Sequence, residues 1–207
     1  MSTLTAAGPT GPPLAGTSAG WRNVRKRWTI DEFHEIYSLP RFESKRLVLL
    51  DGEILEMPNP NAPHDTGLGL ALAALTAIFG AGYWVRGQMA LRLSQITDPM
   101  PDVAVVRGTP RDYPQQPTSA LLVVEVSDST LAIDTGAKAN LYAKAGIADY
   151  WVVDLNNRVL IVHRDPRPIV NAPFGAAFAT ITSLSPTELV IPVAAAQSSI
   201  RVSDLLP

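Results

Sequence analysis

Blocks of apolar residues along the chain predict a sheet with two main helices. Apolar side chains dominate the stretch 67–82, GLGLALAALTAIFGAG, which predicts a buried helix from about His64 to Phe79. This stretch is too short and too rich in glycine to predict a membrane span. A second helix is predicted from about Thr130 to Gly146, because glycine is the usual left-handed residue after a helix.

Short apolar runs between turn residues predict the strands. Two hairpins are predicted, one turning at Asp51-Gly52 and one at Asn156-Asn157. The segment 120–127 is apolar on both faces, so we expect it in the centre of a covered sheet. The fold class is therefore α/β, with an open mixed β-sheet flanked by helices. Further strands are predicted at YWVRG (83–87), MALRLS (89–94), DVAVVRG (102–108) and, weakly, 188–193.

The N-terminal segment differs in composition from the rest of the chain. Residues 1–20 are mostly Ala, Gly, Pro, Ser and Thr, which predicts a disordered tail. Residues 21–28, WRNVRKRW, form either a solvated linker or a basic arm that contacts phosphates. We therefore divide the chain into 1–27, a disordered tail with a basic arm, and 28–207, a single domain.

Composition narrows the class of protein. The chain has 207 residues, 46% of them hydrophobic and 17% charged, which is ordinary for a globular domain. Its net charge is −2, so a nucleic-acid role would need a local basic surface. There is no cysteine, which excludes disulfides, thiol catalysis and cysteine zinc sites. We expect no signal peptide and no membrane contact, and a cytoplasmic location.

Two carboxylates are the main candidates for chemistry. Glu125 interrupts the apolar strand SALLVVEVS, where an isolated charge would be costly, and Asp102 begins the strand PDVAVV. Each has a structural alternative: Asp102 as a turn residue, and Glu125 in a buried salt bridge with Arg or Lys. If the two strands are adjacent and antiparallel, both carboxylates meet at one place and repel unless a cation joins them. A hard divalent cation, Mg²⁺ with Mn²⁺ as a substitute, would satisfy them.

The predicted helix after Glu125 carries a lysine that could lie near these two carboxylates. Lys138 and Tyr142 are four residues apart, so they share one helix face. The alternative for Lys138 is a solvated helix lysine. His34 and His163 are isolated, so the spacing does not predict zinc.

Five motifs in this order resemble a known family. They are LLDGEILEMPNPNAPHD, PDVAVV, LLVVEVSDST, DTGAKANLYAKAGIADYWVVD and the hairpin that follows. Together they resemble the Uma-type "putative restriction endonuclease" family of the PD-(D/E)XK nuclease superfamily, which is widespread in bacteria. The resemblance covers roughly residues 28–206 and implies a restriction-endonuclease-like fold.

The resemblance also implies roles for individual residues. Asp102 matches the metal-binding Asp, Glu125 its acidic partner, and Lys138 the family's catalytic lysine, which lies on the following helix. Ser127 occupies the place of the lysine in the simplest superfamily pattern. Glu53 and His64, with Tyr142 beside Lys138, are possible additional site residues.

One position departs from the family pattern. Val48 stands where the family commonly has Glu ahead of the DGE turn. If that Glu holds metal, this chain lacks a ligand, and either Glu53 or Glu56 substitutes or activity is weak.

The resemblance therefore implies a Mg²⁺-dependent endodeoxyribonuclease, a hydrolase of phosphodiester bonds. Its partner would be DNA, and a homodimer would allow both strands to be cut. We expect Arg86, Arg92, Arg107 and the basic arm to meet phosphates. The alternatives are a nuclease-like module that binds nucleic acid or a protein without cutting, and a phosphodiesterase for a smaller or RNA substrate.

Overall fold

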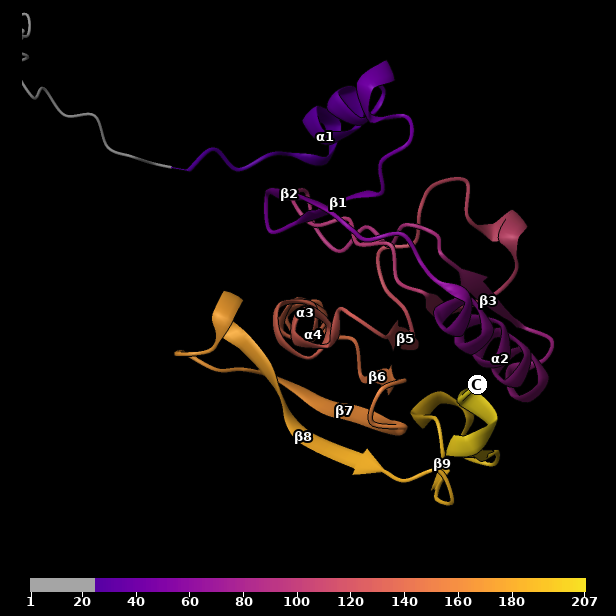
Figure 1. The fold of residues 1–207 in the computed structure, drawn as a ribbon. Helices are drawn as coiled ribbons and strands as arrows, with labels where there is room; N and C mark the ends of the chain where they lie inside the picture. Colours follow the sequence, from indigo (N-terminus) through magenta and orange to yellow (C-terminus); the bar gives the residue numbers. More distant parts are fainter. Residues whose placement is uncertain (1–24) are drawn as a thin grey trace, which may run out of the picture.

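A six-stranded mixed sheet forms the centre of the protein (Figure 1). The computed structural model describes residues 25–207, so the predicted tail and Arg22 lie outside the described residues. The strand order is β3-β4-β5-β6-β7-β8, and only the pair β5–β6 is parallel. The predicted mixed α/β fold is confirmed, with 120–127 in the interior of the sheet.

The elements follow one another in a mixed order. The helices are α1 (Ile30–Tyr37), α2 (Ala62–Phe79), α3 (Leu131–Ile133), the π-helical turn η3 (Asp134–Lys138) and α4 (Ala139–Lys144). The strands are β1 (Leu47–Leu50), β2 (Glu53–Glu56), β3 (Tyr83–Gly87), β4 (Val103–Arg107), β5 (Leu122–Ser127), β6 (Asp149–Asp154), β7 (Val159–Pro168), β8 (Ala176–Leu184), β9 (Leu189–Val190) and β10 (Ile200–Arg201). Short 3₁₀ turns lie at Pro40–Phe42, Pro110–Asp112, Pro173–Gly175, Val193–Ala195 and Val202–Leu205.

Helices cover the sheet on both faces. Helix α2 packs on one face, where alternate residues of β5 such as Val124 and Val126 join Leu75 in the larger core. The α3–α4 segment packs on the other face, where Val123 meets Tyr142. Burial on both faces explains why β5 is apolar along its whole length.

The hairpin β1–β2 packs against α4, where Val48 and Leu50 of β1 form a small apolar cluster with Leu141 (Figure 1). Asp51 and Gly52 both have positive φ, 49° and 81°, as the predicted tight turn requires. Even-numbered residues of β1 face α4, since Val48 clusters with Leu141. This arrangement brings one face of β1 close to the end of β5.

The predicted helix 130–146 is interrupted by the π-turn η3. The Tyr150 hydroxyl donates a hydrogen bond of 2.8 Å to the carbonyl of Asp134. A carbonyl engaged in this way is less available to an α-helical donor, and single π-turns in helices are frequent at functional sites. The helix ends as predicted, since Gly146 has a φ of 74°.

One strand prediction is wrong, and one strand was not predicted. Residues 89–94 form an irregular ribbon with single bonds, from Leu91 N to Pro99 O and from Leu93 N to Thr97 O. Pro99 and Pro101 in the facing segment lack N–H donors, so no continuous ladder forms. Strand β8 was not predicted, because it is an edge strand whose residues 179–183 are all exposed and carry no apolar alternation.

Helix α2 is buried along one side, at Gly67, Ala71, Leu75 and Phe79, and exposed along the other, so the prediction of a buried helix is correct for one face only. Within residues 25–207, no helix has both the length and the apolar character needed to cross a bilayer.

Candidate functional site

A cavity of about 140 Å³ lies between β1, the loop before α2, the end of β5 and the turn η3. Its wall is mixed: apolar side chains of β1, Met57 and Met100 face polar ones from α2, β5 and η3. The lining residues are Tyr37, Arg46, Leu47, Val48, Met57, Pro58, Asn59, Pro60, Asn61, His64, Met100, Asp102, Glu125, Val126, Asp128, Ser129, Thr130 and Lys138. Asp102, Glu125, Lys138 and His64 are therefore brought together in one pocket.

Strand pairing sets the two carboxylates opposite each other. Val103 pairs with Val124 in the antiparallel ladder between β4 and β5. One step further along this register, Asp102 faces Glu125. Directly opposed residues of an antiparallel pair project to the same face with Cβ atoms about 5 Å apart. The expectation that adjacent antiparallel strands bring these residues into one spot is confirmed.

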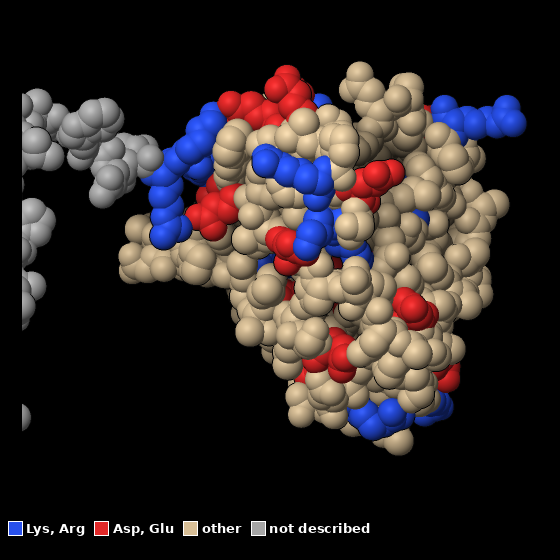
Figure 2. All heavy atoms as spheres, turned by 45° about the horizontal axis from the view of Figure 1, so that its top comes forward, with Lys and Arg blue, Asp and Glu red and all other residues tan. Residues whose placement is uncertain are grey.

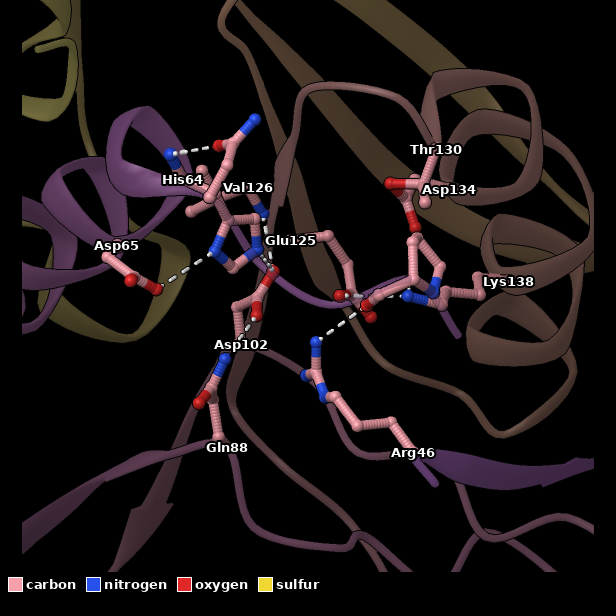
Figure 3. A network of polar contacts seen from close by, with 12 residues as sticks. Arg46, His64, Asp65, Gln88, Asp102, Glu125, Val126, Thr130, Asp134 and Lys138 are labelled. Carbon is pink, nitrogen blue, oxygen red and sulfur yellow. Dashed lines mark hydrogen bonds and ion pairs between the residues drawn. The ribbon is translucent and has the colours of Figure 1, made fainter. Parts of the chain in front are cut away.

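Asp102 is held from three directions (Figure 3). Its Oδ2 lies 3.2 Å from His64 Nε2 and accepts a bond of 2.9 Å from the backbone N–H of Val126. Its Oδ1 accepts a bond of 3.3 Å from Gln88. Burial alone would raise the pKa of Asp102, but the His64 hydrogen bond, the His64 charge and the Val126 N–H together lower it. Asp102 is therefore ionised at neutral pH.

His64 reaches Asp102 because it lies in the first turn of α2. Asn61 caps this helix by accepting a bond of 3.1 Å from the His64 N–H, which fixes the imidazole at the pocket. The hydrogen bond to Asp102 raises the pKa of His64, against the opposing effect of burial. The contact with Asp102 thus favours the protonated form of His64.

Glu125 is almost completely buried, with 2% exposure. Lys138 Nζ lies 3.0 Å from its Oε2, and the Tyr142 hydroxyl donates a bond of 2.8 Å to its Oε1. Burial raises the pKa of Glu125 to about 8, although Lys138 opposes the change. The buried salt bridge that was the alternative for Glu125 does exist, and its partner is the lysine of the same pocket.

Lys138 lies between two carboxylates. Besides Glu125, its Nζ lies 2.9 Å from Asp134 Oδ1, and Asp134 in turn accepts a bond of 2.5 Å from Thr130. Burial alone would lower the pKa of Lys138, but the charges of Glu125 and Asp134 outweigh burial and raise it. Lys138 is 6% exposed, so the alternative of a solvated helix lysine is wrong.

Strand β1 supplies the opposite wall of the pocket. Arg46 and Val48 are two residues apart, so they share a face, and both line the cavity. Arg46 donates a bond of 3.0 Å to Pro58 O and points toward the Glu125–Lys138 pair in Figure 3. The two acidic residues considered as substitutes for a Glu at position 48 lie outside this pocket: Glu53 pairs with Arg25 and Glu56 with Lys45.

Four residues of this site were missed from the sequence: Arg46, Gln88, Thr130 and Asp134. Asp134 is four residues before Lys138, a spacing that the sequence displays. Gln88 gave no such signal, because its approach to Asp102 depends on its positive φ of 49° after β3. Arg46 directly precedes the apolar run 47–50 of the hairpin, and no feature of this segment indicates a site residue.

The basic residues expected to meet phosphates are mostly engaged within the protein. Arg86 is 4% exposed, lies over the Trp84 ring and donates to Ala90 O, so that expectation is wrong. Arg25 and Arg27 form ion pairs with carboxylates of the β1–β2 hairpin. On the face that carries α1 and this hairpin, basic and acidic side chains are interspersed (Figure 2).

The donor set fits a single hard cation held by two carboxylates. Asp102 and Glu125 use only part of their lone pairs in the bonds described above. Mg²⁺ is commonly bound by one or two carboxylates, with water and phosphate oxygens completing the shell. Within the described part of the chain, no group of three or more His, Asp or Glu side chains is arranged to hold a metal ion. A metal held by Asp102 and Glu125 would therefore need further ligands of other kinds, such as backbone carbonyls, water or phosphate oxygens.

Comparison with known proteins identifies the family of this chain. The family model described as "Uma2: Putative restriction endonuclease" matches residues 30–194. The chain belongs to this family. No curated protein matches the sequence.

A solved structure shares the fold. It is described as a "putative nuclease belonging to DUF820" from Anabaena variabilis ATCC 29413 and superposes with a TM-score of 0.63. The match covers 86% of this chain and 96% of that chain, at 18% sequence identity. At this identity the likeness shows the fold alone. Membership of the Uma2 family supports a nuclease.

Proposed function

We propose that this Uma2 protein is a metal-dependent endonuclease that hydrolyses phosphodiester bonds of DNA. The observation that carries the proposal is the placement of Asp102 opposite Glu125, with Lys138 beside Glu125 in the same pocket. Two carboxylates and a lysine on one cavity suit phosphoryl chemistry, where charge stabilisation and positioning do most of the work. Family membership supports the same reaction class.

In this proposal, Asp102 and Glu125 hold Mg²⁺, or Mn²⁺ in its place. The bound cation would polarise a phosphoryl oxygen and lower the pKa of water. His64, Gln88 and the Val126 N–H fix the Asp102 carboxylate in its orientation. Tyr142 fixes one oxygen of Glu125 in the same way. The protein thus sets both carboxylates before substrate arrives.

Lys138 acts as a fixed cation in this proposal. Its raised pKa keeps the ammonium protonated at neutral pH, so it is unsuited to accept a proton from water. It instead stabilises the negative charge that develops on the phosphate. Arg46, across the pocket, offers a second positive charge to the same group.

Two further expectations belong to this proposal. A homodimer rests on the family resemblance, and a cytoplasmic location on the composition. DNA contacts would have to be local, because acidic and basic side chains are mixed on the face in Figure 2.

A plasmid-cleavage assay tests the proposal. Supercoiled plasmid would be incubated with the protein in Mg²⁺, Mn²⁺ or EDTA, beside Asp102→Ala, Lys138→Ala and the exposed control Asp165→Ala. We expect nicking that needs metal, is lost in the first two variants and is kept in the third.

An RNA oligonucleotide and a small phosphodiester, run in parallel, separate DNA cleavage from the phosphodiesterase alternative. Binding of DNA without cleavage in either metal would favour the binding module, for which Val48 in the pocket wall is the supporting observation.

A further inference from the structure

Asp134 is a buried charge to which the proposed reaction gives no role. Its exposure is 1%, and it is not among the residues that line the pocket. Enclosing a carboxylate in a protein interior is costly unless a cation and hydrogen bonds compensate it. The contacts of Asp134 therefore indicate what it does.

Among the described residues, Lys138 is the cation in contact with the Asp134 side chain. One oxygen lies 2.9 Å from Lys138 Nζ and the other accepts the Thr130 hydroxyl. The backbone of Asp134 is fixed independently, because its carbonyl accepts the Tyr150 hydroxyl and its N–H bonds to Thr130 O. The π-turn thus holds this carboxylate in one position behind the lysine.

Lys138 is shared almost equally between two carboxylates. Its Nζ lies 3.0 Å from Glu125 and 2.9 Å from Asp134. Glu125 faces the pocket, whereas Asp134 lies behind it. A lysine held by Glu125 alone would compete with any cation for that carboxylate, because its own buried charge would have no other partner.

We propose that Asp134 is the positioning residue for Lys138: it is the lysine's permanent counter-ion, and it thereby frees Glu125 to bind a divalent cation. This inference rests on the proposed function. It assigns Asp134 an indirect effect on metal affinity, exerted through Lys138, rather than contact with metal or substrate. Outer-sphere groups of this kind commonly affect metal affinity by about 10- to 100-fold.

Asp134→Asn tests the inference, because asparagine keeps the shape and a hydrogen-bond acceptor for Thr130 but removes the charge. Mn²⁺ binding would be measured by calorimetry on the full chain. We expect the Kd for Mn²⁺ to rise about tenfold, and the Mg²⁺ concentration for half-maximal cleavage to rise in parallel. Asp154→Asn is the matched control, since Asp154 is also buried, at 2% exposure, but bonds to Asn157 away from the pocket. An unchanged Kd in Asp134→Asn would overturn the inference.

A double-mutant cycle with Lys138→Met separates positioning from a general structural role. If Asp134 acts through Lys138, adding Asp134→Asn to Lys138→Met leaves the Mn²⁺ Kd unchanged. A similar rise in both backgrounds would overturn the inference.

If Asp134→Asn does not fold, Thr130→Val takes its place. A smaller rise in the Mn²⁺ Kd is then expected, and an unchanged Kd is the contrary result. Absence of Mn²⁺ binding by the wild type would overturn the proposed function as well, whereas equal binding by wild type and Asp134→Asn overturns only this inference.

Discussion

The Lys138 ammonium lies 3.0 Å from the Glu125 carboxylate inside the pocket wall, where both side chains are nearly inaccessible to solvent. This contact joins two interpretations of Glu125 that the sequence leaves as alternatives. Glu125 does pair with Lys138, and the pair lies in the candidate site. Substitutions at Glu125 can therefore separate its structural contribution from its chemical one.

Glu125→Gln is expected to keep the fold and lose cleavage. With a pKa of about 8, the carboxyl is largely neutral at pH 7, so the amide replaces it with little change. We expect the free energy of unfolding at pH 7, measured in EDTA by urea denaturation, to stay within about 1 kcal/mol of the wild type. A loss of several kcal/mol would show that the charged salt bridge is what the fold needs.

The same substitution should remove a pH dependence of stability. The folded-state pKa of Glu125 lies above the ordinary value of 4.5, so the folded protein retains a proton that the unfolded chain releases. The wild type should therefore lose stability as pH rises from about 4.5 to about 8. Urea unfolding across this range in EDTA should show a smaller decrease in Glu125→Gln. Equal decreases in both proteins would contradict the raised pKa.

Metal binding should release a proton. The cation binds the carboxylate form of Glu125, which is the minor form at pH 7. Calorimetry with Mn²⁺ in two buffers of different ionisation enthalpy should give release of about one proton at pH 7 and less at pH 9. Affinity should increase as pH rises toward 8. Proton release that is the same at both pH values would count against Glu125 as a ligand.

His64→Gln should reduce stability mainly at acidic pH. The pKa of His64 is raised above its ordinary value of 6.5, chiefly by Asp102, so its contribution is fully present below 6.5 and is lost as pH rises through the folded-state pKa. We expect a loss of about 1 kcal/mol at pH 5.5 and a smaller loss at pH 8.5, both from urea unfolding. A loss that does not depend on pH would show that the charge on His64 is unimportant.

The central strands and the facing carboxylates could be predicted because local sequence decides them. Asp102 and Glu125 stand out as charges beside apolar runs, and they meet because β4 and β5, joined by the loop 108–121, pair antiparallel. The prediction for His64 depended on the family resemblance, whereas Tyr142 was indicated by its spacing of four residues from Lys138. Both lie in the pocket network, whereas Glu53 is exposed and paired with Arg25.

What the sequence did not reveal depends on contacts between distant segments. Strand β8 has little apolar alternation because it lies at an edge, and its pairing with β7 decides its structure. The π-turn at Asp134 follows from a hydrogen bond with Tyr150 on β6. Arg46 reaches the pocket because the hairpin packs on α4, which no local pattern shows.

Arg46→Ala should weaken DNA binding without changing the metal requirement. Arg46 lines the pocket and uses one donor on Pro58 O, which leaves other guanidinium donors for phosphate. Fluorescence anisotropy with a duplex in Ca²⁺ should show a lower affinity and a salt slope reduced by about one. Arg158→Ala is the matched control, because Arg158 also donates to a proline carbonyl, that of Pro207, away from the pocket. Equal affinities for the two variants would remove Arg46 from the substrate site.

The most direct test of the site is the position of a bound Mn²⁺ ion, located by anomalous diffraction from crystals grown with MnCl₂. The account predicts one strong peak in the pocket, within coordination distance of both Asp102 and Glu125, with Lys138 still beside Asp134. A pocket without a peak, in crystals where Glu125 keeps its bonds to Lys138 and Tyr142, would contradict the proposal that these two carboxylates form a metal site.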